Sequence, residues 1–500
     1  MIRTVSGYVS GLQTTDGAVS IFKGIPYAAP PVGKLRWKAP EKFPTWPGTR
    51  ECTRFSASAI QAPQAPFLMW SEEFIIDTST GYSEDCLTLN IYCPSKVTDK
   101  NKPVVVYFHG GSFVSGGSSC EIYNGEQLAR HGVIFVTVNF RVGVLGLLAS
   151  SEISREDPNN ISGNYQLLDQ IAALRWVKEN IEAFGGNPEN VTIMGQSSGA
   201  GSVCTLSVSP MCKGLFRRVF AMSHDTLNMP VSAASDESGN FVNKNIYEPL
   251  KECEREGDKA MGRGLEEMRS MTTDEILKLP PFYSYCIDGH VLTCTFNEGV
   301  RKGLTDDCEF MVTYTADDPT LFAIMRDLAV KNQTTQEDYE AVMREYFGEH
   351  ADRAMKLYPF NGKPQEFIMN ISHERLTASV MMLASLRKGK TWIAQFNHVM
   401  PGPDSQMWGA FHTSDVPYWL DYFSDKRKDL WREEDYSLGA ELVVRLAGFA
   451  KNGSPNAEGL IEWKPSDGSN IYAIESGNIH EAKLLDDERY EFWRDVYCVN

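Results

Sequence analysis

The stretch VTIMGQSSGAGSV (Val191–Val203) is the part of the sequence that most strongly indicates the fold. Its first four residues form an apolar run of the kind that builds a buried strand, and the small residues from Ser198 onward suit a helix packed closely against other chain segments. Between them, GQSSG (195–199) matches G-x-S-x-G, the sharp strand-to-helix turn that exposes a serine hydroxyl. The stretch therefore predicts a strand, a nucleophilic Ser197 and a helix. The alternative is a glycine-rich turn whose serine has no catalytic role.

Similar strand and helix patterns surround this turn. Apolar runs predict buried strands, and residues 164–184 carry apolar side chains at helical spacing before a glycine stop. The expected strands are 103–108, 133–140, 218–223, 309–315 and 390–397. This alternation predicts an α/β fold with a large, mostly parallel central sheet and helices on both faces.

We expect one domain over residues 1–500. The more polar stretches near 231–280 and 326–360 are interpreted as helical insertions over the carboxyl ends of the strands. There they would form part of the wall of an active site.

The charge balance excludes some classes of partner. The chain has 48 Lys and Arg against 65 Asp and Glu, a formal net charge of −17. A nucleic acid or an anionic membrane would need a basic face, so neither is expected as a partner.

The cysteines and the N-terminus bear on the compartment. The eleven cysteines include no C-x-x-C pair, and the first residues, MIRTVSGYVSG, show no apolar signal segment. We therefore expect reduced thiols, a cytoplasmic location, and neither metal nor cofactor. The oligomeric state is left open.

A second glycine motif, HGGSF (109–113), directly follows the expected strand 103–108. Glycine backbone allows several N–H groups to point at one oxygen atom, as stabilisation of an oxyanion requires. The alternative is a plain tight turn.

Candidates for a base and an acid occur later in the chain. Among the nine histidines, His412 stands out because it lies in GAFHTSD (409–415), a loop-like stretch of small residues after the strand 390–397. Hydrolases with this type of elbow place their residues in the order Ser, acid, His. The acid should therefore follow a strand between 197 and 412, and Asp317 and Asp318 directly follow the strand 309–315.

Longer motifs add a family resemblance. They are FKGIPYA (22–28), PVGKLRW (31–37), SEDCLTLN (83–90), GNY (163–165) and FGGNP (184–188). With them the chain resembles the type-B carboxylesterases, the α/β-hydrolases that include cholinesterases and bacterial para-nitrobenzyl esterases. The resemblance covers about residues 5–475 and implies the α/β-hydrolase fold.

The resemblance also implies roles for individual residues. Ser197 would be the nucleophile, His412 the general base and Asp318 the acid, with Asp317 as the second choice. Asp318 replaces the family's Glu, so its loop must lie closer to His412. The oxyanion donors would be the N–H groups of Gly111, Ser112 and Ser198, and Ser223 would support the site. The implied function is hydrolysis of small to medium carboxylic esters through an acyl-enzyme.

The chain departs from the family at several positions. Gln196 stands where the family has Glu, near a second acid that Asp415 matches. His224 replaces a glycine, and it would narrow the acyl pocket, bind a polar substrate, or be an ordinary structural histidine. Phe113 and Trp70 are further pocket candidates. Cys86 lacks the family's disulfide partner, because Ala-Ile-Gln occupies 59–61.

Two other functions stay open at this stage. An amide or lactone hydrolase would use the same three residues, because both reactions pass through the same acyl-enzyme. A catalytically inactive, cholinesterase-like binding protein is the second alternative, although such proteins lack the serine or the histidine that this chain keeps.

Overall fold

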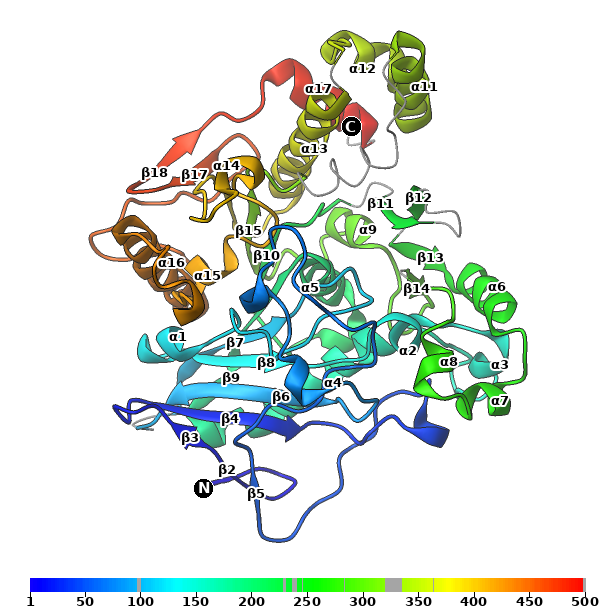
Figure 1. Cartoon of the computed structure of the whole chain (residues 1–500), viewed down its shortest axis with the longest axis vertical. Coiled ribbons are helices and arrows are strands. Elements are labelled where there is room, and N and C mark those ends of the chain that lie inside the picture. The colour runs from blue at the N-terminus through cyan, green and yellow to red at the C-terminus, as the bar shows by residue number, and fades with distance from the viewer. Residues whose placement is uncertain are drawn as a thin grey trace.

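The computed structural model describes residues 1–96, 100–227, 231–235, 241–244, 246–282, 284–319, 335–362 and 364–497. Its centre is an eleven-stranded sheet (Figure 1). In spatial order the strands are β18 (Asn478–Ala482), β17 (Ile471–Glu475), β16 (Thr391–Phe396), β15 (Glu309–Thr315), β10 (Arg218–Met222), β9 (Gly186–Gln196), β7 (Lys102–Phe108), β8 (Ile134–Val138), β6 (Thr88–Pro94), β4 (Val19–Pro26) and β3 (Leu12–Gln13).

The middle of this sheet is parallel and its two margins are antiparallel. The seven strands from β17 to β8 pair in parallel, whereas β18, β6, β4 and β3 run against their neighbours. The strands expected from the apolar runs all lie in the parallel part, so the prediction of a mostly parallel sheet is confirmed. The antiparallel margins were not anticipated.

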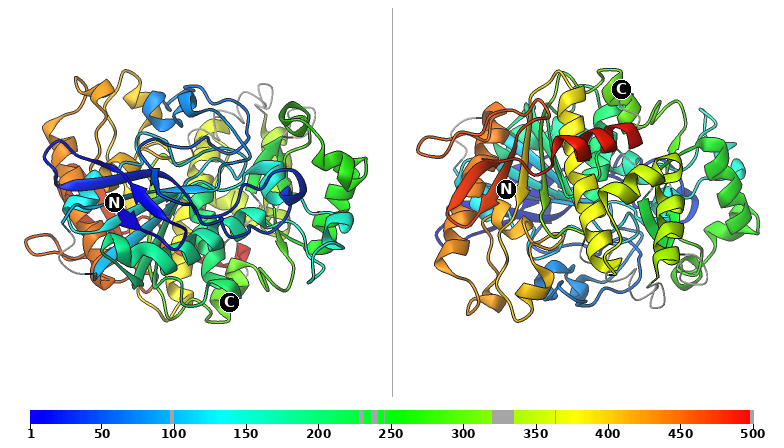
Figure 2. Two further views of the ribbon diagram at one scale, coloured as in Figure 1. Left: turned by 90° about the horizontal axis from the view of Figure 1, so that it is seen from below. Right: turned by 90° about the horizontal axis from the view of Figure 1, so that it is seen from above.

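Helices cover both faces of the sheet because successive residues of each strand point to opposite sides. On β7, Val104, Val106 and Phe108 pack into one apolar core, which also contains residues of α4 (Tyr165–Asn180), α5 (Ser198–Val208) and α13 (Pro364–Leu386). Val105 and Tyr107 pack into the other core, with α1 (Glu126–Arg130) and α16 (Glu433–Asn452). Figure 2 shows α13 and α16 on opposite sides of the strands.

The prediction of a helical insertion over 231–280 is wrong for its first part. An antiparallel pair, β11 (Val231–Ser235) with β12 (Phe241–Lys244), comes first, and β13 (Tyr247–Pro249) then pairs with β14 (Tyr285–Ile287). Strand pairing satisfies the backbone here, and for β13 the partner lies far along the chain, which local composition does not reveal. Helices occupy only the rest: α6 (Leu250–Met261), α7 (Leu265–Arg269) and α8 (Thr273–Ile276).

The second insertion is helical where it can be seen. Helices α11 (Gln336–Phe347) and α12 (Ala351–Leu357) fill most of it, and residues 326–334 lie outside the described part of the chain. The remaining elements are β1 (Ile2–Arg3), β2 (Tyr8–Ser10), β5 (Thr49–Glu51), α2 (Gly143–Leu147), α3 (Ser151–Ser154), α9 (Phe296–Arg301), α14 (Ser405–Trp408), α15 (Val416–Trp419) and α17 (Asp487–Val496). Within the described ranges, every helix is too short or too polar to cross a lipid bilayer.

Candidate active site

Ser197 occupies a strained turn between β9 and α5. Its φ of 59° and ψ of −126° lie in a region of backbone conformation that residues other than glycine rarely adopt. A Cβ on Gly195 would come within 2.3 Å of the carbonyl oxygen of Gly199, and one on Gly199 within 2.1 Å of that of Phe108. Serine is a favoured helix cap, yet the Ser197 hydroxyl makes no capping bond to α5. The glycines therefore allow a close turn whose hydroxyl is not used by the helix.

Asp317 attaches the loop that carries His412 to the end of β15. Its backbone pairs with that of Phe411 in a parallel bridge. Its N–H donates to the carbonyl of Ala410 at 3.0 Å, and its Oδ2 accepts from the N–H of the same residue at 2.8 Å. The two adjacent aspartates are thus separated in function, since Asp317 binds the backbone of the loop.

Asp318 contacts the imidazole itself. Its Oδ1 lies 2.9 Å from Nδ1 of His412, and the Thr315 hydroxyl donates to its Oδ2, also at 2.9 Å. Burial raises the pKa of Asp318, but the charge and hydrogen bond of His412 outweigh this and hold it below its usual value, with help from the nearby Ser223 hydroxyl. Burial lowers the pKa of His412, and Asp318 and Asp415 raise it above the ordinary value.

Gln196 and Asp415 complete the surroundings of the imidazole. The amide Nε2 of Gln196 lies 3.2 Å from Nε2 of His412. Asp415 is fully buried, and among the described residues its two carboxylate oxygens have no hydrogen-bond partner. Burial, assisted by the charge of Asp318, raises the pKa of Asp415 to about 7.

The HGGSF loop runs beside this turn. Gly111, Ser112 and Phe113 all have positive φ, at 119°, 54° and 65°. A Cβ on Gly110 would lie 3.0 Å from Cβ of Ser197, so the loop passes directly beside the serine. The N–H of Ser198 belongs to the first turn of α5, where amides have no partner within the helix.

Gln61 clamps this loop, and the sequence analysis missed its contribution. Its Oε1 accepts from the N–H of Gly116 at 2.7 Å, and its Nε2 donates to the carbonyl of the same residue at 2.7 Å. It lies in the segment 59–61, where the family's disulfide cysteine is missing, and Cys86 is a free, buried thiol. The sequence signal that was available is a glutamine in the segment where the family has its disulfide cysteine.

The three candidate pocket residues lie around this centre. Gly201 lies one helical turn from Ser197. A Cβ on Gly201 would lie 3.0 Å from the His224 ring and 3.2 Å from the Phe113 ring. Phe113 also packs edge-on against Tyr285, with ring centroids 5.3 Å apart. Trp70 contacts the loop of His412, where its indole N–H donates to the backbone carbonyl of His412 at 3.2 Å.

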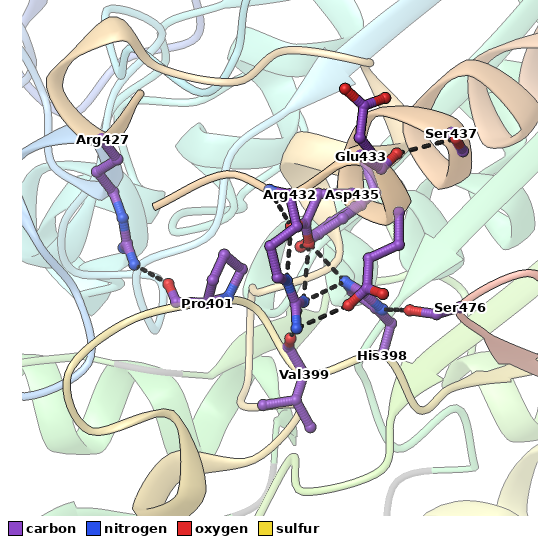
Figure 3. Close-up of polar contacts among 11 residues, drawn as sticks. His398, Val399, Pro401, Arg427, Arg432, Glu433, Asp435, Ser437 and Ser476 are labelled. Atoms are coloured by element: carbon purple, nitrogen blue, oxygen red, sulfur yellow. Dashed lines mark hydrogen bonds and ion pairs between the residues drawn. The ribbon is translucent and has the colours of Figure 1, made fainter. Parts of the chain in front are cut away.

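A second Ser-His-Asp set lies away from this site (Figure 3). His398 Nε2 is 2.6 Å from Oδ1 of Asp435, and the Ser476 hydroxyl contacts His398 Nδ1. Ser476 is exposed in the turn between β17 and β18, and Asp435 is shared with Tyr418 at 2.7 Å and Arg432 at 2.9 Å. This network connects the end of β16 to the start of α16, so we interpret it as structural.

No three His, Cys, Asp or Glu side chains within the described ranges lie close enough together to hold a metal ion. The site instead provides a hydroxyl after β9, a carboxylate after β15 and an imidazole on the loop that follows β16. A parallel sheet with an elbow serine of this kind defines the class of α/β-hydrolases.

Comparison with known proteins narrows the class to a family. The model of the carboxylesterase family matches residues 1–493, so the chain belongs to that family and is a carboxylic ester hydrolase. A fumonisin B1 esterase of Sphingopyxis macrogoltabida is 31% identical over 92% of this chain and 83% of its own length. A para-nitrobenzyl esterase of Bacillus subtilis (strain 168) is 30% identical, over 93% and 92%.

The solved structures agree. A carboxylesterase of Geobacillus stearothermophilus superposes with a TM-score of 0.79 at 25% identity, and covers 98% of this chain and 99% of its own. A PNB esterase structure gives a TM-score of 0.77 at 25% identity, with the same coverage.

Proposed function

We propose that this protein hydrolyses carboxylic esters of small to medium size through an acyl-enzyme on Ser197, with His412 as the base and Asp318 as the acid. The observation that carries the proposal is the 2.9 Å contact between Asp318 and Nδ1 of His412, next to the strained turn of Ser197. An Nδ1–H that donates to a carboxylate leaves Nε2 as the nitrogen that accepts a proton.

The proposed reaction has two steps. His412 Nε2 takes the hydroxyl proton as Ser197 Oγ attacks the ester carbonyl, and the N–H groups of Gly111, Ser112 and Ser198 bind the oxyanion. His412 then gives the proton to the departing alcohol, which leaves an acyl-Ser197. In the second step a water loses its proton to His412 and attacks the acyl group. His412 then returns that proton to Ser197 Oγ as the acid is released, which restores both side chains.

Two aromatic rings lie on the acyl side of the proposed site. Phe113 and His224 meet over Gly201, one turn of α5 beyond Ser197. A chain that extends from the acyl carbon in this direction meets both rings, so we expect an optimum at short acyl chains. We also propose a cytoplasmic location, which the free thiols of the ten described cysteines support.

Hydrolysis of para-nitrophenyl esters from acetate to laurate tests the proposal, with Ser197→Ala and Ser198→Ala measured alongside. Ser197→Ala is expected to lower kcat by roughly 10⁵–10⁶. Ser198→Ala keeps the backbone N–H, so its kcat should change little. A folded Ser197→Ala variant that retains more than a few per cent of the activity would overturn the proposal.

A further inference from the structure

The side chain of Gln196 faces the nitrogen of His412 that must accept the proton. Nδ1 of the imidazole is bound by Asp318, and its other nitrogen, Nε2, lies 3.2 Å from the amide nitrogen of Gln196. Gln196 is buried, and a Cβ on Gly110 would come within 3.0 Å of its Oε1. The amide is therefore held between the HGGSF loop and the imidazole.

The charged groups around His412 come from several elements. Asp318 follows β15, and Asp415 is at the start of α15, on the loop of His412 itself. Both carboxylates raise the pKa of the imidazole. His373 of α13 is partly buried near Asp317 and Asp318; burial lowers its pKa, and the two aspartates oppose that effect. Trp70, whose indole binds the backbone of His412, carries no charge. On the side of β9 the neutral amide of Gln196 lies beside the imidazole.

We propose that Gln196 is a positioning residue that favours the unprotonated form of Nε2 of His412, so that the enzyme retains its base at a lower pH than a glutamate at this position would allow. The inference rests on the proposed function. An amide N–H that donates to the Nε2 lone pair stabilises the neutral imidazole. A carboxylate at the same position would stabilise the imidazolium instead, and one within 4–6 Å typically shifts a pKa by about 1–3.

The amide is compatible with the proton transfers of both steps. Nε2 of the neutral imidazole has one lone pair, so the amide N–H must give way when the Ser197 hydroxyl donates to it. Once Nε2 has received the proton it becomes a donor, and a donor facing the amide N–H is unfavourable. Rotation about the last side-chain bond of Gln196 presents Oε1, which accepts from Nε2–H. The proton then goes to the departing alcohol, and the amide returns to its first orientation without having gained or lost a proton.

The test is the pH dependence of kcat/KM for para-nitrophenyl butyrate, an ester with no ionising acyl group. Gln196→Glu is isosteric and adds a charge, and Asp415→Asn is the matched variant that removes a charge from another side. Because a raised pKa of His412 removes the free base at a higher pH, Gln196→Glu should move the acidic limb of the profile upward by about one to two pH units. Asp415→Asn should leave the limb in place or move it downward.

Two results would overturn the inference. One is a Gln196→Glu profile whose plateau falls while its acidic limb stays in place, since that describes a structural role only. The other is a downward shift of the limb.

A second measurement separates this inference from the proposed function. The imidazole ¹⁵N shifts of His412, titrated in Ser197→Ala and in Ser197→Ala/Gln196→Glu, report its protonation without catalysis. If the wild-type enzyme hydrolyses no ester, the proposed function fails, but a higher pKa for His412 in the double variant still supports the role of Gln196. Equal His412 titrations in both backgrounds would refute that role.

Discussion

At the scale of residues, two adjacent aspartates have different tasks. Asp317 binds the backbone of Ala410 and so fixes the loop, while Asp318 reaches the imidazole of His412. Asp318 is one methylene shorter than the family's Glu, so its loop must lie closer to His412. The hydrogen bonds between Asp317 and the backbone of Ala410 hold the two loops together. The sequence analysis preferred Asp318 and kept Asp317 as the second choice. The geometry favours that order.

Isosteric variants should separate these tasks. Asp318→Asn removes the charge that orients and stabilises the imidazolium, so we expect kcat to fall by about 10⁴, as for the buried acid of other such sites. Asp317→Asn keeps an oxygen that can accept from Ala410, and it should stay within about tenfold of the wild type. Steady-state kinetics on a para-nitrophenyl ester measure both, and the reverse ranking would assign the acid to Asp317.

At the scale of elements, the turn that carries Ser197 depends on how closely α5 meets the neighbouring strand. The ends of β9 and β7 lie side by side, with Phe108 paired to Gly195, and the first turn of α5 packs onto the carbonyl of Phe108. A side chain at position 199 would push the helix away from this strand. The motif therefore specifies a packing distance as well as a reactive group.

Gly199→Ala is expected to be destabilising. Its Cβ would lie 2.1 Å from a backbone oxygen that cannot move without displacing β7, and overpacking of this kind typically costs about 1–3 kcal/mol. Tm should fall by several degrees, or soluble protein should be lost. Gly264→Ala is the control because a Cβ there has nothing within 4 Å. Equal Tm values for the two variants would contradict the packing argument.

At the scale of the whole molecule, the thiols are distributed through the interior. Nine of the ten described cysteines are buried, Cys308 is partly exposed, and all ten are free. Burial raises the pKa of Cys52 to about 11 and that of Cys308 to about 12. The thiolate is the reactive form, so the folded chain should react slowly and at few positions.

Alkylation with iodoacetamide at pH 8, mapped by mass spectrometry, tests this distribution. In the native protein Cys308 should be modified first among the described cysteines, since it is the one the reagent can reach. In denaturant all should react, which controls for the chemistry. Native modification of Cys86 at a rate equal to that of Cys308 would contradict the burial of Cys86 in the core.

Local patterns were sufficient for much of this protein. The parallel strands β7, β8, β9, β10, β15 and β16 were predictable because strands buried on both faces need continuous apolar runs. Ser197 was identifiable because its turn needs glycines at 195 and 199, and His412 because a loop of small residues follows β16. Each of these features is recognised from residues within a few positions of one another along the chain.

Other features depend on residues far apart in sequence. The antiparallel pairing of β6 with β4 and β8, the β13–β14 pair, the Gln61 clamp on Gly116 and the contact between Gln196 and His412 each join segments whose distance the sequence does not specify. Residue types at these positions are compatible with several partners, because a glutamine or a short polar strand pairs with whatever the fold brings near it. Local patterns thus indicated the candidate reacting groups, whereas chain packing determined which side chains surround them and shift their pKa values.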